Sequence, residues 1–112
     1  MEKSPPELVA RFGEVMGHHA EVAQRKMFGY PAGFIGGNMV TGLFENHWVV
    51  RLNDADRDEL LAVDGSAVFA PMPGRPMKAF AIVPPSIVAD DAALEAWLER
   101  AFANGRSMPP KK

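Results

Sequence analysis

The feature of this chain that most constrains its fold is a stretch of alternating apolar and polar residues, residues 22–52, broken only by short turn signals. Alternation with a period of two is typical of half-buried strands. The later turn signals, Gly36-Gly37-Asn38 and Glu45-Asn46, are too short for a crossover and contain residues that tolerate positive φ. The stretch therefore predicts an antiparallel meander of four strands, at residues 22–28, 32–35, 39–44 and 47–52.

A helix is predicted before this meander. The Ser-x-x-Glu pattern of residues 4–7 is a capping box, in which the serine and glutamate side chains bond to free backbone amides of the first turn. Gly17 then ends the helix. The spacing of the apolar residues predicts one buried stripe, made of Leu8, Phe12, Val15 and Met16.

Two helices and two strands are predicted after the meander. Asn53 caps a helix over residues 54–63, and Asp90 caps a last helix that closes at Asn104-Gly105. The prolines Pro84-Pro85 end strand pairing because they lack amide donors. The two strands, joined by the proline-glycine loop Pro71 to Pro76, lie at residues 67–70 and 78–83.

Together these elements predict an α+β fold of two layers, an antiparallel five- or six-stranded sheet with three helices mainly on one face. The order is helix, three or four strands, helix, two strands, helix. We expect a single domain over residues 1–104, followed by a flexible tail rich in proline and lysine over residues 105–112.

Two strands of the expected sheet are apolar on both faces. They contain Trp48-Val49-Val50 and residues 79–83, and this pattern indicates central strands. Three helices can cover only one face of the sheet. The second apolar face therefore predicts self-association, as a two-fold homodimer.

Composition limits the class of protein. Apolar residues make up 47% of the 112-residue chain, yet no run approaches the roughly 18–20 apolar residues of a membrane span. The amino terminus also lacks a signal-peptide segment, so we expect a cytoplasmic protein without membrane contacts. The chain has no cysteine, which excludes disulfides, thiolate metal sites and thiol catalysis. A net charge of −2 and a pI of about 5.9 exclude a global attraction to nucleic acid.

No pattern indicates catalysis, a cofactor or a metal. His18 and His19 are adjacent on a helix and so point apart, and His47 lies in a strand with no carboxylate at a chelating spacing. The glycines from Gly33 to Gly37 lead into a hairpin and not into a helix amino terminus, so they form no phosphate cradle. We therefore expect a protein that is not an enzyme and binds no metal or cofactor. The aromatic residues that could line a small-ligand pocket are interpreted as core: Phe34, Phe44, Trp48 and Phe80.

Two short cationic segments, Arg25 to Gly29 and Pro71 to Lys78, are the candidate binding sites. The first hypothesis is one rigid surface that binds an acidic partner or phosphate, made of Arg25, Lys26, Arg75 and Lys78. Strand neighbours face opposite sides, so one of Arg25 and Lys26 points inward. In the alternative, this inward cation pairs with Glu21 or Glu45 and is structural. The proline loop is likewise either a stiff recognition loop or a plain connector.

A series of short motifs carries a family resemblance. In order along the chain these are Lys26-Met27-Phe28-Gly29, Gly33-Phe34, Gly37, Met39, Phe69, Pro73-Gly74-Arg75-Pro76 and Val83-Pro84. With these motifs the chain resembles, from Ala20 to Phe102, the amino-terminal domain of the TfoX (Sxy) family of bacterial competence regulators. The resemblance implies the same order of helices and strands, and a role in turning on DNA-uptake genes instead of catalysis.

The chain also departs from this family at two points. Tyr30-Pro31-Ala32 stands where many members have a second glycine. The helical carboxy-terminal domain of the full regulators does not follow, so a stand-alone form is expected.

Two functions follow from these observations. The first is a non-enzymatic regulatory or adaptor domain that acts through protein contacts, with a partner in the transcription machinery. The alternative is direct but weak nucleic-acid binding through Arg25, Lys26, Arg75, Lys78 and the basic tail. Four to six phosphate contacts would make that binding fall steeply with salt.

Overall fold

Six strands form one antiparallel sheet in the computed structural model, which describes residues 2–72 and 74–111. The order across the sheet is β1-β2-β3-β4-β6-β5, and every pair of neighbours is antiparallel. The predicted meander and the antiparallel sheet are thus confirmed. The strands are β1 (Ala23–Met27), β2 (Tyr30–Ile35), β3 (Asn38–Phe44), β4 (His47–Arg51), β5 (Val68–Met72) and β6 (Arg75–Val83).

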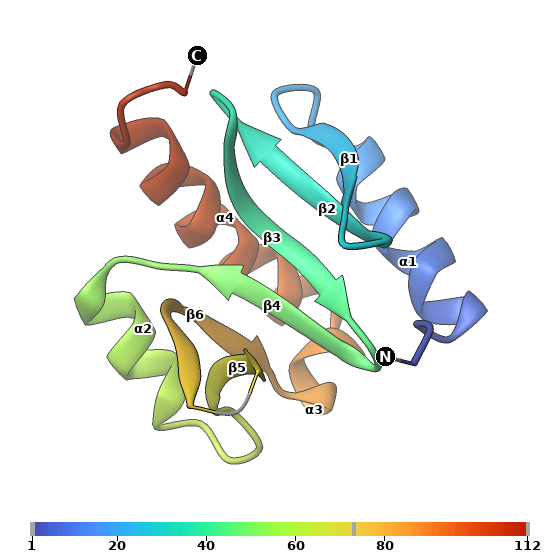
Figure 1. Ribbon diagram of the computed structural model, residues 1–112, viewed down its shortest axis with the longest axis vertical. Helices are drawn as coiled ribbons and strands as arrows, with labels where there is room; N and C mark the ends of the chain where they lie inside the picture. Colours follow the sequence, from blue (N-terminus) through green and yellow to red (C-terminus); the bar gives the residue numbers. More distant parts are fainter. Residues whose placement is uncertain (1, 73, 112) are drawn as a thin grey trace.

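Four helices cover one face of this sheet. All of them contribute side chains to the same hydrophobic core, and Figure 1 shows α4 passing behind β3 and β4. The α+β class with helices on one face is therefore confirmed. The helices are α1 (Pro6–Gly17), α2 (Asp54–Leu61), α3 (Pro85–Val88) and α4 (Asp91–Ser107).

The helix caps agree only in part with the sequence. Asn53 accepts a hydrogen bond from the Asp56 amide, and Asp90 accepts two from the first turn of α4, as predicted. The predicted capping box of α1 does not form, so that prediction is wrong. Pro5 occupies the cap position, and the Ser4 hydroxyl donates to the Glu45 carbonyl at 2.6 Å. Proline already presets the helical φ, so α1 starts without a side-chain cap.

The helix α3 is absent from the predicted elements, and this is a correction. Pro84-Pro85 not only ends the last strand but also fits the first turn of a helix, where no amide donor is needed.

The end of α4 also differs from the prediction. The helix runs through Asn104-Gly105 to Ser107, because the buried Gly105 serves close packing and does not stop the helix. The expected domain boundary at residue 104 therefore falls inside α4. Residues 108–111 are held against the β2–β3 turn: Asn38 donates to the Pro109 carbonyl at 2.9 Å, and the Lys111 amide donates to the Gly36 carbonyl at 2.7 Å.

The expected proline-glycine loop is mostly strand. Pro71 and Met72 belong to β5, Arg75 begins β6, and Gly74 has a φ of 75° in the turn between them. β5 is an edge strand, where the missing amide of a proline breaks no ladder bond. Pro73, at the centre of that loop, lies outside the described residues.

Apolar residues fill both faces of the central strands. Trp48 packs on Phe12 of α1 with ring centroids 5.0 Å apart, and its indole donates to the buried Thr41 hydroxyl at 2.9 Å. On the opposite face, a second cluster contains Val49, Phe69 and Phe80. The prediction of a central strand at Trp48-Val49-Val50 is therefore confirmed.

We predict opposite effects of glycine-to-alanine changes in α1 and α4. A Cβ at Gly105 would lie 2.4 Å from Cγ1 of Val40, so Gly105→Ala should lower the free energy of unfolding by about 1–3 kcal/mol. A Cβ at Gly13 would meet nothing within 4 Å, so Gly13→Ala should raise it by about 0.5–1 kcal/mol. Urea denaturation of both variants measures this, and equal signs would contradict the packing role of Gly105.

Candidate partner-binding surface

The face of the sheet without helices is concave. Register shifts interrupt the β2–β3 pair at Gly33/Phe34 and the β5–β6 pair at two places, and such irregularities bend strands. As a result, the β1–β2 turn and the β5–β6 hairpin, at opposite ends of the sheet, line one hollow. We call the helix-free side of the sheet the open face.

This hollow has a volume of about 230 Å³ and an almost entirely apolar lining. Its floor comes from the second hydrophobic cluster, where the rings of Tyr30, Phe44 and Phe69 follow one another at centroid distances of 5.1 and 5.3 Å. Its rim comes from the two segments singled out in the sequence, through apolar residues: Met27, Phe28, Pro71 and Met77.

Arg25 and Lys26 face opposite sides of β1, as strand neighbours must. Arg25 lies on the open face, with its guanidinium 5.1 Å from the centre of the Phe34 ring. Lys26 instead lies beside the amino-terminal segment and Val9 of α1. Both are exposed, and neither forms an ion pair within the described chain.

The alternative of a buried, paired cation is therefore not what the structure shows. Glu21, one of the two expected partners, instead accepts 2.8 Å hydrogen bonds from Arg106. These bonds raise the pKa of the Arg106 guanidinium above its usual value. The other expected partner, Glu45, lies close to the backbone amide of Glu2.

Lys78 does not join Arg25 in one surface, and neither does Lys26. Arg75 pairs with Met72 beside the β5–β6 turn, whereas Lys78 lies with Arg57 and Leu61 of α2 on the helix side. The expectation of a single surface made by all four cations is therefore wrong, because bulged β6 turns Lys78 away from the open face.

Sequence reasoning missed Arg51, a second cation on the open face. Its guanidinium lies 5.7 Å from the centre of the Phe80 ring. Arg25 and Arg51 each stand two residues away, on the same strand face, from a residue that lines the hollow: Met27 for Arg25 and Val49 for Arg51. Two residues span about 7 Å along a strand, so both cations stand close to the hollow. Successive residues of β4 alternate between the two faces, so Arg51 could have been predicted to share the face of Val49.

Charge is separated between the two layers. The six strands contain five of the 12 Lys and Arg residues and none of the 14 Asp and Glu residues. The acidic residues lie in helices, turns and the amino-terminal segment, with four of them in α2 alone. The sheet layer is thus basic in a chain whose net charge is negative.

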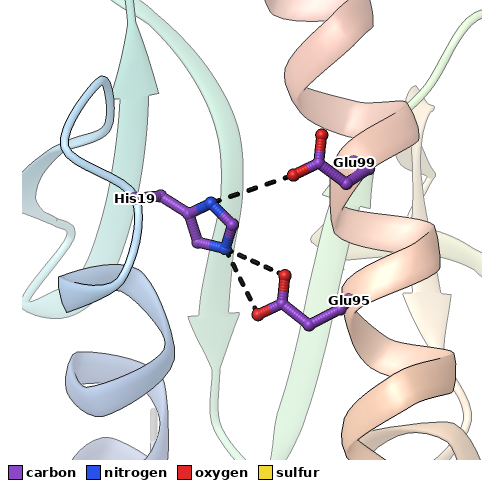
Figure 2. A group of neighbouring side chains, drawn as sticks. All are labelled: His19, Glu95 and Glu99. Atoms are coloured by element: carbon purple, nitrogen blue, oxygen red, sulfur yellow. Dashed lines mark hydrogen bonds and ion pairs between the residues drawn. The ribbon is translucent and has the colours of Figure 1, made fainter.

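A separate group of titratable side chains joins the segment after α1 to α4 (Figure 2). Nε2 of His19 lies 2.9 Å and 3.2 Å from the two carboxylate oxygens of Glu95, and Nδ1 lies 3.9 Å from Glu99. The imidazole also packs edge-on against Phe102 at 4.8 Å. The one signal for this group in the sequence is the i, i+4 spacing of Glu95 and Glu99.

These three residues have the side-chain types that hold a divalent cation. However, the two carboxylates contact opposite nitrogens of one ring, so an ion bound to either nitrogen would leave the other contact outside its coordination. We interpret the group as a polar bridge that ties the turn after α1 to α4. The expectation of no bound metal stays a prediction.

Comparison with known proteins decides the family. Residues 14–104 match the family model described as the TfoX N-terminal domain. The chain belongs to this family. No curated protein and no solved structure matches the chain. The resemblance found in the sequence is thereby confirmed.

In this TfoX N-terminal domain, residues that carry the family resemblance line the hollow: Met27, Phe28, Met39 and Phe69. The motif of residues 26–29 contains the end of β1 and the β1–β2 turn, and Lys26 and Met27 point to opposite faces of β1. None of the described helices is long and apolar enough to cross a bilayer.

We predict that the bridge around His19 is structural. His19→Ala should lower the free energy of unfolding by about 1 kcal/mol, because it removes the ion pair and the contact with Phe102. The exposed neighbour gives the control, and His18→Ala should change stability by less than about 0.5 kcal/mol. Thermal melts with and without EDTA should coincide. A melting temperature that rises with equimolar zinc would instead identify a metal site.

We predict that Arg25 and Lys26 contribute little to stability. Each alanine variant should change the free energy of unfolding by less than about 1 kcal/mol, because both side chains are exposed. Urea melts of the single variants test this. A loss of several kcal/mol would be the signature of a buried, paired cation.

Proposed function

We propose that this TfoX N-terminal domain is a non-enzymatic regulatory or adaptor domain that acts through protein contacts on its open face. One observation carries the proposal: the open face combines an apolar hollow with cations that no described carboxylate neutralises. Exposed apolar surface rimmed by polar groups is typical of interaction sites. Family membership supports a role in the control of transcription, including that of DNA-uptake genes.

The geometry favours protein contacts over direct nucleic-acid binding. Arg25 and Arg51 lie on the open face, but Lys26 and Lys78 lie on the helix side. A single nucleic-acid duplex, or one single-stranded nucleic acid, could therefore contact only some of the cations that the nucleic-acid hypothesis requires. Few phosphate contacts give weak, salt-sensitive binding.

The homodimer expected from the sequence stays a proposal, with fewer surfaces through which the two copies could meet. Part of the second apolar face is already buried by the curvature of the sheet, since Val49, Phe69 and Phe80 are each less than 7% exposed. A two-fold contact through the remaining open face would also bring Arg25 and Arg51 of two copies together. Like charges facing each other disfavour such a contact. Any dimer is therefore expected through another surface.

A regulatory function predicts transcript changes that depend on the open face. A strain that lacks this chain should show altered transcript levels, and expression of the wild-type chain should restore them. The Lys26→Glu variant should restore them too, whereas Arg25→Glu should not, since only Arg25 lies on the open face. RNA sequencing of the four strains measures the effect.

Two results would contradict this function. One is an unchanged transcript profile in the strain that lacks the chain. The other is a changed metabolite profile with unchanged transcripts, which would indicate an enzyme.

A further inference from the structure

Phe28 occupies a position that does not serve the stability of the isolated chain. Its φ is 54°, in the left-handed region that a bulky side chain rarely adopts. Its side chain is also 78% exposed, the highest exposure among the large hydrophobic residues of the described chain. An aromatic residue that is both strained and exposed indicates a functional constraint.

Phe28 stands at the rim of the hollow, between the hollow and the groove around Lys26. Across the hollow, Met77 and Pro71 of the β5–β6 hairpin line the opposite wall. Methionine side chains adapt to the shape of a partner, and Met27 and Met39 line the same hollow. The site therefore offers a flexible apolar wall beside an exposed ring.

The size of the hollow selects the kind of ligand. Its volume of about 230 Å³ lies below the range of roughly 300–1,000 Å³ typical of small-molecule pockets. A single bulky side chain of a partner matches it better. Concavity also argues against a membrane, because a bilayer surface cannot enter a hollow.

The charge around the hollow selects the chemistry of that partner. Arg25 and Arg51 stand beside the hollow, and no strand of the described chain carries an acidic residue. Both guanidiniums lie over aromatic rings, Phe34 and Phe80, which hold the cations in place and leave their donors free for carboxylates. A partner with acidic residues on both sides of an apolar side chain is complementary to this arrangement.

We propose that the open face binds a short acidic peptide segment, whose bulky apolar side chain enters the hollow against Phe28 while its carboxylates contact Arg25 and Arg51. This inference rests on the proposed function and names the class of partner. The segment is part of another protein, because a second copy bound open face to open face would oppose arginine to arginine.

The first test separates stability from binding at Phe28. Phe28→Asn creates an Asn-Gly turn, the sequence that best fits two successive residues with positive φ, and Gly29 already has a φ of 84°. The melting temperature should therefore stay the same or rise by a few degrees, while the affinity for the peptide falls about tenfold. A fall in the melting temperature would show that Phe28 serves the fold, and would overturn the proposal.

The second test uses a randomised library of short peptides displayed on phage and selected on the wild-type chain. Selected peptides should share Asp or Glu on both sides of a Phe, Trp, Leu or Met residue. Fluorescence anisotropy with these peptides should show an affinity about tenfold weaker for Phe28→Asn, Arg25→Glu and Arg51→Glu. The matched controls on the helix side, Lys26→Glu and Lys78→Glu, should stay within about twofold.

Several results would overturn the proposal. These are the absence of selected peptides, selection of peptides without acidic residues, or equal loss for Arg25→Glu and Lys26→Glu. Binding to anionic vesicles or to a single-stranded DNA oligonucleotide that Phe28→Asn abolishes would also reject it, as would a dimer in light scattering that Phe28→Asn dissociates. If peptide selection fails while the transcript effect of Arg25→Glu persists, the regulatory function stands and only the class of partner is wrong.

Discussion

The central strand β4 is buried on both faces, and the positions of the helices and of the outer strands follow from this burial. Trp48 and Val49 are neighbours in β4 and point to opposite faces, yet they are 1% and 0% exposed. Four helices cover the Trp48 side, where Phe12 and the Thr41 hydroxyl fix the indole. No helix of the described chain covers the Val49 side, so the sheet must bury that face by its own curvature.

The curvature of the sheet leaves an apolar hollow on the open face. The irregular β5–β6 pairing turns Phe69 over the centre of the sheet, next to Phe44 and Phe80. Because the sheet is finite, this coverage stops short of the β1–β2 turn, and a hollow remains between the two hairpins. The same curvature that protects the second cluster therefore leaves apolar surface at its edge.

Because charge is separated between the two layers, the charged side chains of each layer have different partners. Carboxylates of the helix layer are used within the fold: Arg11, Arg57, Arg100 and Arg106 all form ion pairs with acidic residues. The strand cations have no such partners in the described part of the chain. They instead lie over aromatic rings or in solvent, so their electrostatic interactions are available to a second molecule.

Local signals in the sequence were enough to predict most of the elements and their order. Alternation from residue 22 to residue 52 and the cap residues Asn53 and Asp90 are local signals, and they gave the meander, two helix starts and the α+β class. These signals missed α3 and the true role of Gly105, whose reason is a contact with Val40, far away in the chain. Tertiary contacts set which cations share a face, the contact of His19 with Glu95, and the hollow that Phe28 borders with Met77. These contacts depend on strand bulges and on sheet curvature, and neither leaves a periodic signal along the chain.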